Sequence, residues 1–235
     1  MRSRMAAKPY AIPPRNRRYF RSKLRGWFQG NARDFPWRRT RNPYHILIAE
    51  ILLQQTDAKK VAAIYKSFTR SFRTPAALAR SRLSDVRRFI SKIGLDYRAR
   101  RLISMARQIS GPGRAAIPSD ESRLMQLPGV GPYIARAVLA AAFGKRVAVV
   151  DTNVIRVLGR FFGITSPRPR PRTDPRIWAT VRCLLPRRAA YCRAWNYAIL
   201  DFAAATCRHR KPRCAECPCR RRCHYFRQGG APRSL

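Results

Sequence analysis

The segment LPGVGPYIARAV (127–138) decides the fold, because it joins two helical stretches through a tight glycine turn. We predict one helix over residues 122–126, the turn over 127–131 and a second helix over 132–143. Gly129 and Gly131 let the backbone turn with few side-chain clashes. The N–H groups at the start of the second helix can then hold a phosphate. An ordinary helix–helix turn uses the same residues, so this segment by itself indicates only a helical fold with a candidate anion-binding turn.

Helical periodicity also dominates the rest of the chain. Residues 44–55, YHILIAEILLQQ, are apolar nearly all round and predict a buried helix, with Pro43 well placed at its start. Further helices are expected over residues 19–29, 58–72, 74–79, 83–93, 98–109, 152–160, 177–185 and 191–205. Alternating strand patterns are scarce, so we predict an all-α protein.

The charge of the chain is extreme. Its 235 residues include 51 Lys and Arg against 11 Asp and Glu, a net charge of +40, while 46% of the residues are hydrophobic. That hydrophobic fraction excludes an ordinary disordered chain, and the charge favours a polyanionic partner such as DNA or RNA. A chain that is basic throughout and an anionic membrane surface are the alternatives. We expect no membrane span and no secretory signal, because no apolar run reaches the required length.

Seven cysteines in a chain without secretory features indicate metal ligation rather than a disulfide framework. Four of them follow the spacing C-x6-C-x2-C-x5-C; they are Cys207, Cys214, Cys217 and Cys223. Four thiolates suit zinc or an iron–sulfur cluster, and one compact loop with a single CxxC favours the cluster. Cys219 lies inside this array but outside the spacing, and we expect Cys183 and Cys192 to be packed thiols.

A basic loop, RHRKPR (208–213), lies between the first two cysteines of the array. A bound metal would hold this loop rigid, and its simplest use is to grip phosphate. Arg210 and Lys211 are therefore candidate contacts to a nucleic-acid backbone.

Two acidic residues stand in apolar surroundings. Glu50 lies within IAEILLQQ, where an unpaired carboxylate costs several kcal/mol, and Asp151 ends the segment VAVVD. A buried salt bridge for Glu50 and a helix N-cap for Asp151 are the structural alternatives, and a cap does not exclude catalysis. Two such carboxyl groups suit cleavage of a glycosidic bond, because one can protonate or polarise the leaving group while the other stabilises the cationic sugar.

Four motifs in order give the chain a family resemblance. FPWRRTRNPYHILIAEILLQQT (35–56), LPGVGPYIARAV (127–138), VVDTNVIRVLGR (149–160) and the cysteine array occur as they do in endonuclease III and its relatives. The chain therefore resembles the helix-hairpin-helix–Gly/Pro–Asp superfamily of DNA glycosylases from about residue 35 to residue 226.

The resemblance implies a particular architecture and cofactor. It implies a six-helix barrel with the helix-hairpin-helix motif over residues 40–145, and a four-helix domain built from residues 18–39 and 146–235. The second domain would carry a [4Fe–4S] cluster on the four array cysteines, DNA would lie in the cleft between the domains, and residues 1–17 would form a basic flexible tail.

The resemblance also assigns roles to single residues. Asp151 matches the family's essential aspartate, and Glu50 matches the glutamate of the adenine and thymine mismatch branches. Tyr133 stands where bifunctional members carry the lysine that forms a Schiff base, so we expect base removal without strand cleavage by a lyase step. We expect the Tyr133 side chain to stack on or bond the extruded base, with apolar packing as the alternative. Gln54 or Gln55 is expected to fill the gap that a flipped nucleotide leaves.

The substrate base is the least determined point. AFGKRVAVVDTNVIRV (142–157), IGLDYRARRL (93–102) and the cluster loop are similar to the thymine/uracil mismatch branch, whereas LLQQT (52–56) is similar to the adenine branch. Only 12 residues follow Cys223, whereas adenine glycosylases usually add a further domain. We therefore expect a monomeric, cytoplasmic, nucleoid-associated enzyme that removes thymine or uracil opposite guanine from double-stranded DNA. The alternatives are an adenine glycosylase acting on A:8-oxoG or A:G, a non-catalytic damage sensor, and an RNA-binding protein with structural zinc.

Overall fold

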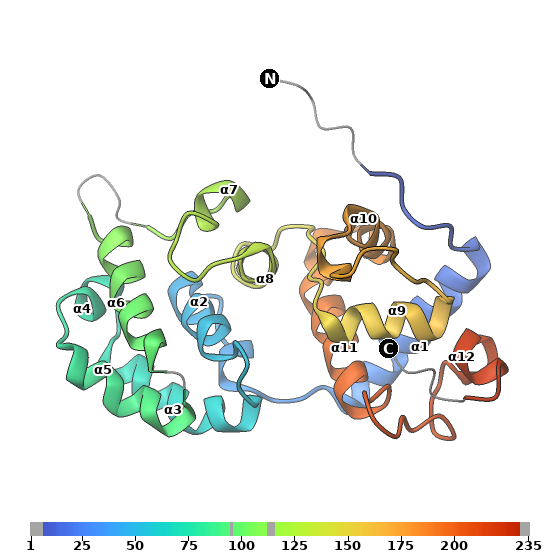
Figure 1. Ribbon diagram of the computed structural model, residues 1–235, viewed down its shortest axis with the longest axis horizontal. Coiled ribbons are helices and arrows are strands. Elements are labelled where there is room, and N and C mark those ends of the chain that lie inside the picture. Colours follow the sequence, from blue (N-terminus) through green and yellow to red (C-terminus); the bar gives the residue numbers. More distant parts are fainter. Residues whose placement is uncertain (1–6, 95, 112–115, 231–235) are drawn as a thin grey trace. The chain divides into compact units, whose positions relative to one another are not determined.

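The computed structural model describes residues 7–94, 96–111 and 116–230, and within these ranges it is helical with no strand (Figure 1). The predicted all-α class is confirmed. Contacts divide the chain into two compact units. We call residues Asp34–Lys145 the continuous unit, and Met1–Arg33 with Arg146–Leu235 the split unit. No helix in the described ranges is long and apolar enough to cross a membrane.

The continuous unit is arranged around one buried helix, α2 (Pro43–Leu52), in which eight residues are buried. Asn42 caps this helix by accepting hydrogen bonds from the N–H groups of Tyr44 and His45, and Pro43 occupies the first helical position. Helix α2 packs against α3, α6 and α8. The helices of this unit are α2 (Pro43–Leu52), α3 (Ala58–Ser71), α4 (Pro75–Ala79), α5 (Leu83–Ile90), α6 (Tyr97–Ile109), α7 (Glu121–Leu124) and α8 (Pro132–Ala141).

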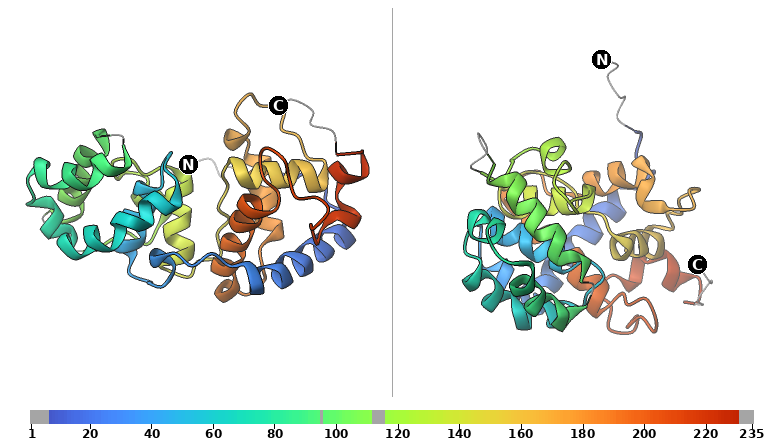
Figure 2. Two further views of the ribbon diagram at one scale, coloured as in Figure 1. Left: turned by 90° about the horizontal axis from the view of Figure 1, so that it is seen from below. Right: turned by 60° about the vertical axis from the view of Figure 1, so that its left-hand side comes forward.

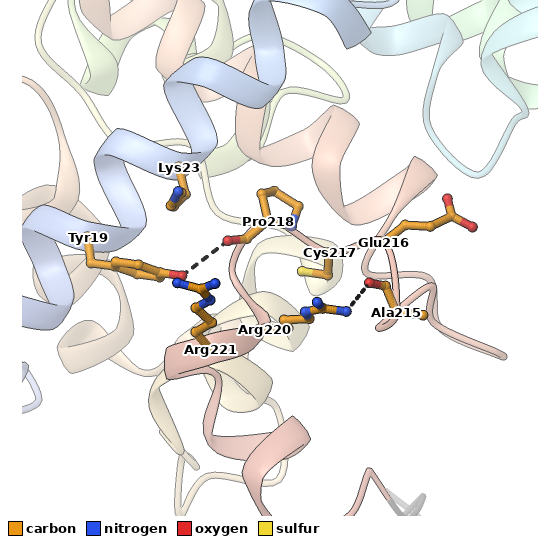
Figure 3. A pocket seen from close by; sticks show the side chains of 8 residues that line it. All are labelled: Tyr19, Lys23, Ala215, Glu216, Cys217, Pro218, Arg220 and Arg221. Atoms are coloured by element: carbon orange, nitrogen blue, oxygen red, sulfur yellow. Dashed lines mark hydrogen bonds between the residues drawn. The ribbon is translucent and has the colours of Figure 1, made fainter.

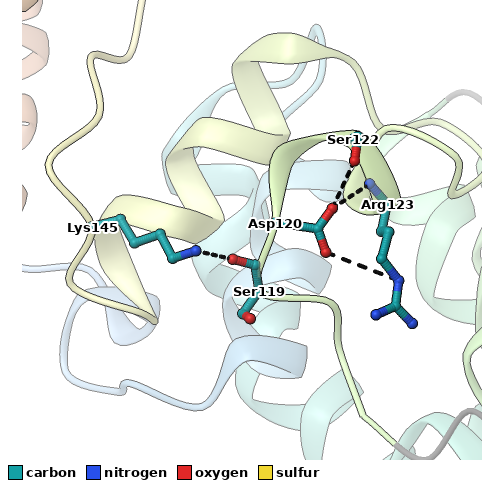
Figure 4. Close-up of polar contacts among 5 residues, drawn as sticks. All are labelled: Ser119, Asp120, Ser122, Arg123 and Lys145. Atoms are coloured by element: carbon teal, nitrogen blue, oxygen red, sulfur yellow. Dashed lines mark hydrogen bonds and ion pairs between the residues drawn. The ribbon is translucent and has the colours of Figure 1, made fainter.

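The short helix α7 and the loop before it are fixed by polar contacts (Figure 4). Asp120 accepts hydrogen bonds from the Arg123 N–H and the Ser122 hydroxyl, both at 2.8 Å, and so caps the helix. The Lys145 ammonium, at the end of the unit, donates to the Ser119 carbonyl. The predicted glycine turn follows α7, and Gly129 adopts a left-handed φ of +82° that favours glycine.

The split unit packs the N-terminal helix α1 (Pro14–Asn31) against helices from the other end of the chain (Figures 1 and 2). Phe20 and Leu24 of α1 are fully buried in a core that includes Val157, Phe161 and Trp195. The remaining helices of this unit are α9 (Thr152–Phe162), α10 (Pro175–Leu184), α11 (Cys192–Ala205) and α12 (His224–Arg227).

Polar contacts also bind the N-terminal stretch to the C-terminal stretch of the split unit. The Arg33 side chain donates to the buried carboxylate of Asp201 at 2.6 Å. The Tyr10 hydroxyl donates to Asp174 at 2.7 Å, and the Tyr10 N–H donates to Thr180. The tail predicted over residues 1–17 is therefore too long, because residues from Tyr10 onward are anchored and α1 begins at Pro14; residues 1–6 lie outside the described ranges.

Two other predicted boundaries differ from the structure. The continuous unit begins at Asp34 rather than at residue 40, since Phe35 stacks on Trp37 and Trp37 packs against Tyr65 of α3. Helix α2 ends at Leu52 rather than at residue 55, because Gln55 adopts a left-handed φ of +52°, which ends the helix in a turn.

Candidate active site and cysteine cavity

Glu50 lies on α2 and is only 8% exposed, as the sequence predicted for a carboxylate in an apolar helix. Its neighbours on the helix, Ile48, Ala49, Ile51 and Leu52, are fully buried. Because glutamates are rarely buried, a buried carboxyl group on a core helix is a candidate functional residue.

The two glutamines that follow α2 differ in their contacts, although the sequence did not distinguish them. The Gln54 side-chain amide donates to the Gly129 carbonyl at 3.0 Å, so this residue joins the turn after α2 to the glycine turn. Gln55 is exposed and carries the left-handed φ. Within the continuous unit, the structure thus brings Gln54 and Gly129 together and leaves the Gln55 side chain at the surface.

The second helix of the glycine turn is α8, which begins at Pro132 with Gly131 at the N-cap. Tyr133 lies in its first turn and is half-buried. Arg136 donates to Glu121 at 2.7 Å and so joins α8 to α7 across the turn. The first turn of α8 has N–H groups without intrahelical acceptors, as phosphate binding requires.

Asp151 is the N-cap of α9, so the structural role that the sequence left open is real. One carboxylate oxygen accepts the Val154 N–H at 2.7 Å, and the other accepts the Asn153 side-chain amide at 2.6 Å. The residue is half-buried. Two donors at the helix N-terminus therefore fix the direction of this carboxylate.

Arg156 lies about one turn after Asn153, the hydrogen-bond partner of Asp151, and it connects Asn153 to the cysteine segment. It donates to the Asn153 side-chain oxygen at 3.0 Å, to the Ala203 carbonyl at 2.9 Å and to the Cys207 carbonyl at 2.9 Å. Burial lowers the pKa of Arg156 despite the nearby Cys207 and Asp151. The contacts Asp151–Asn153–Arg156 therefore end on the residue that opens the cysteine array.

The array cysteines line a small, partly open cavity in the split unit. Its walls include aromatic and aliphatic side chains of α9 and α11 and all four cysteines of the predicted spacing, Cys207, Cys214, Cys217 and Cys223. Cys219 lines the same cavity and is 1% exposed. Cys219 lies outside the predicted spacing, and the sequence did not indicate that it lines the same cavity as the four array cysteines.

Hydrogen bonding and burial separate these thiols by pKa. The Cys219 thiol and the N–H groups of Cys219 and Arg220 hydrogen-bond Cys217 and lower the pKa of that residue to about 7. Burial raises the pKa of Cys223 to about 11 and also raises the pKa of Cys207.

The cysteine cavity can be compared with what a metal site requires. A zinc ion needs four sulfurs about 3.8 Å apart, given its Zn–S distance of about 2.3 Å. No three His, Cys, Asp or Glu side chains among the described residues come together closely enough to hold one metal ion. The four cysteines line one apolar cavity, and thiols are the ligands of both zinc and iron–sulfur clusters.

Arg160 anchors the basic loop between Cys207 and Cys214 through hydrogen bonds to its backbone. Arg160 of α9 donates to the carbonyls of Arg208 and His209. Arg210 and Lys211, the predicted phosphate contacts, are exposed, and Lys211 has a left-handed φ of +49°. Both side chains are therefore available to solvent on an anchored loop.

A second hollow lies on the other side of Cys217, between α1 and residues 215–221 (Figure 3). The Tyr19 hydroxyl donates to the Pro218 carbonyl at 3.2 Å, and Arg220 donates to the Ala215 carbonyl at 2.6 Å. The Tyr19 bond joins the cysteine segment to α1, and Lys23, Arg220 and Arg221 also line the hollow.

Comparison with known proteins identifies the family. Residues 48–180 match the HhH-GPD superfamily of base excision DNA repair proteins, and the chain belongs to this family. It is 40% identical to the thymine-DNA glycosylase of Aeropyrum pernix over 88% of this chain and 93% of that protein. It is also 40% identical to the adenine DNA glycosylase of Mycobacterium tuberculosis, over 84% of this chain and 64% of that longer protein.

A solved structure of a thermostable thymine-DNA glycosylase has the same fold. It superposes with a TM-score of 0.85 at 35% identity, covering 91% of this chain and 98% of the solved one.

Proposed function

We propose that this protein is a DNA glycosylase that removes thymine or uracil mispaired with guanine by hydrolysing the N-glycosidic bond. The observation that carries this proposal is the similarity to a thymine-DNA glycosylase over nearly the whole length of both chains. The buried Glu50 and the N-cap Asp151 are the two kinds of carboxyl group that such a reaction needs.

In the proposed reaction the C1′–N bond breaks and its electron pair leaves with the base. Glu50 delivers a proton toward the departing base, directly or through a water molecule. The Asp151 carboxylate stabilises the cationic sugar and orients the water that attacks C1′. As the C1′–O bond forms, that water releases a proton, which replaces the proton that Glu50 gave to the base. The two residues have different surroundings, because Glu50 is buried on α2 whereas Asp151 accepts hydrogen bonds from two N–H donors.

DNA binding would use the other predicted residues. The Gly129–Gly131 turn and the first turn of α8 would hold a phosphate, and Arg210 and Lys211 would contact the backbone from the cysteine loop. Gln55 would fill the space that the flipped nucleotide leaves, because Gln54 is already engaged with Gly129. We propose that the protein binds mispaired duplex DNA as a monomer.

We further propose that the protein has no lyase activity. Tyr133 occupies the first turn of α8, and a phenol cannot form an imine with the opened sugar. Borohydride added during turnover should therefore trap no covalent protein–DNA adduct. A trapped adduct would show that another amine of the chain attacks the sugar.

For the finer architecture, we propose that the continuous unit contains a six-helix barrel and that the split unit is a four-helix cluster domain. Cys207, Cys214, Cys217 and Cys223 would hold a [4Fe–4S] cluster in the cavity that they line. The group would fix the cysteine loop in place. Purified protein should be brown and contain about four irons per chain, and colourless protein with one zinc would refute the proposal.

A base-release panel tests the function. Duplexes carrying T:G, U:G, A:G, A:8-oxoG and hypoxanthine are incubated with protein, and free base is measured. We expect release from T:G and U:G, with turnover reduced on the order of 10³-fold or more in Asp151→Asn while DNA binding persists. No release from any duplex would favour a damage sensor, and unchanged turnover in Asp151→Asn would refute the assignment of that residue.

The second candidate is an adenine glycosylase. The 40% identity to the Mycobacterium tuberculosis enzyme favours it, although this chain spans only 64% of that protein. Release from A:8-oxoG and A:G, without release from T:G or U:G, would establish this alternative.

A further inference from the structure

Arg98 is the only basic side chain among the described residues that is completely buried. It lies in the first turn of α6, and no ion pair in the described ranges includes it. Burial lowers the pKa of Arg98, which records the cost of removing its charge from water. Such a cost is retained in a protein when the guanidinium makes contacts that another side chain would not make.

Three hydrogen bonds from the Arg98 guanidinium run to residues 52–56, which form the end of α2 and the turn that follows it. One terminal nitrogen donates to the Leu52 carbonyl at 2.9 Å and to the Thr56 hydroxyl at 2.7 Å. The other terminal nitrogen donates to the Gln54 carbonyl. Leu52 and Thr56 lie on either side of Gln55 in the sequence, so the guanidinium spans the turn at the end of helix α2.

The turn needs such a brace. Gln55 has a left-handed φ of +52°, which a residue with a Cβ rarely adopts. The last carbonyls of α2 have no intrahelical donor, and a cation at a helix C-terminus is favoured by the helix dipole. A planar guanidinium can donate to several carbonyls in fixed directions, whereas an ammonium group is a single flexible donor.

Gln54 connects the turn after α2 to a second turn. Its side-chain amide donates to the Gly129 carbonyl, so the turn after α2 and the glycine turn before α8 form one connected surface. Gln55 is the exposed residue of that surface. Its direction depends on the backbone that Arg98 holds.

We infer that Arg98 is a positioning residue: its buried guanidinium locks the turn over residues 52–56 in the conformation that presents Gln55 to the DNA duplex. The inference rests on the proposed function, in which Gln55 fills the space of the flipped nucleotide. Arg98 itself touches no DNA. It acts only through the backbone of the turn.

The first test needs no DNA. Hydrogen exchange is measured residue by residue in Arg98→Lys, with Arg100→Lys as the matched control because Arg100 is exposed on the same helix. We expect exchange of the amides of residues 54–56 to rise by at least about tenfold in Arg98→Lys and to stay unchanged in the control. Unchanged protection of the turn would overturn the inference, and so would an equal rise throughout the continuous unit.

The second test is a double-mutant cycle on DNA. All variants also carry Asp151→Asn, so no base is released, and a 2-aminopurine beside the T:G mispair reports unstacking when the nucleotide flips. We expect Arg98→Lys and Gln55→Ala each to reduce flipping by about tenfold, and their combination to reduce it no further, because both remove the same insertion. Multiplied effects in the combination would overturn the inference.

The two tests separate this inference from the function on which it rests. Suppose that Arg98→Lys loses protection of the turn from exchange, but the parent protein gives no fluorescence change on DNA. That result would refute base flipping and leave the structural role of Arg98 in the turn intact. Normal flipping in the parent that Arg98→Lys does not alter would refute the positioning role and leave the glycosylase proposal intact.

Discussion

The buried charged side chains of the two units make different kinds of contact. In the continuous unit the buried charged side chains are Glu50 and Arg98, one on α2 and the other braced against the turn that follows it. In the split unit they are Asp174 and Asp201, and each binds a residue of the N-terminal stretch, Tyr10 or Arg33. The continuous unit thus places its buried charges at the candidate site, whereas the split unit uses them to join distant parts of the chain.

This difference follows from chain topology. A unit made from one stretch of chain can close around apolar contacts, because its elements are already near one another in sequence. The split unit must recruit residues 7–33 across more than a hundred intervening positions, and directional contacts to a buried carboxylate specify which segment docks. We therefore expect the two units to respond separately to substitutions.

The largest expected effect is on the cysteine cavity. If Cys214 is a ligand of the proposed cluster, Cys214→Ser should lower the iron content and unfold the split unit, while the continuous unit keeps its protection from hydrogen exchange. The prediction of a packed thiol is wrong for Cys183, which is exposed, and correct for Cys192, which is buried. Cys183→Ser is the control, because Cys183 is exposed and lies outside the array. Iron content, colour and segment-resolved exchange measure the result. Equal loss of protection in both units would show that they do not fold separately.

The next effect is on the apolar core of the continuous unit. Leu102 of α6 is fully buried, and Leu102→Ala should lower the free energy of unfolding by about 2–5 kcal/mol through lost burial and a cavity. Segment-resolved exchange should place the loss in residues 34–145. Ser104→Ala on the exposed side of the same helix should leave stability within about 0.5 kcal/mol.

A smaller effect is expected at the buried carboxylate that anchors Tyr10. Asp174→Ala leaves the hydroxyls of Tyr10 and Ser166 and the Arg176 N–H without their acceptor, and should destabilise the split unit by about 1–3 kcal/mol. Denaturant unfolding followed by exchange in residues 7–33 and 146–230 measures it. No change there would mean that water replaces the carboxylate at no cost.

The same residue gives a pH dependence. Burial alone would raise the pKa of Asp174, but hydrogen bonds from Ser166, Tyr10 and the Arg176 N–H hold it below its ordinary value. The folded state therefore favours the ionised form, so the stabilisation is full above the unfolded pKa of about 3.9 and is lost as the pH falls below it. Stability of the split unit should fall less steeply with acid in Asp174→Ala than in the parent protein.

The smallest of these effects on stability is expected at Asp151, although Asp151 is the residue proposed to matter most for base release. Asp151→Ala removes an N-cap and should cost about 1 kcal/mol. A thermal melt measures this loss, and base release by the same sample measures the loss of activity. A loss of several kcal/mol would mean that inactivity in this variant reports unfolding.

Much of the helical fold could be predicted from local patterns. Periodicity located most helices to within a few residues, and the glycines at 129 and 131 located the turn before α8. Helix α1 was predicted too short at both ends, since its charged first turn carries little apolar periodicity. Long-range partners were beyond local patterns, because nothing near Tyr10 or Arg33 indicates Asp174 or Asp201.

The candidate site was predictable where a residue contradicts its surroundings. Glu50 stands out because it is acidic within an apolar helix, and Asp151 because so few acids are present. Arg98 does not stand out among 43 arginines, and its one signal was its place on the apolar face of α6 with Leu102 and Met105. The separate contacts of Gln54 and Gln55 depend on a turn conformation that sequence alone does not specify.

The division of the split unit also affects how the protein is synthesised. Helix α1 emerges from the ribosome early, yet Leu24 packs in a core with Val154, which lies 130 positions later. At about 5–20 residues per second, the apolar face of α1 stays uncovered for roughly ten seconds while the continuous unit emerges and can fold. The nascent chain must therefore carry an exposed, strongly basic amphipathic helix through most of translation, when it is open to chaperones and to the nucleic acid around it.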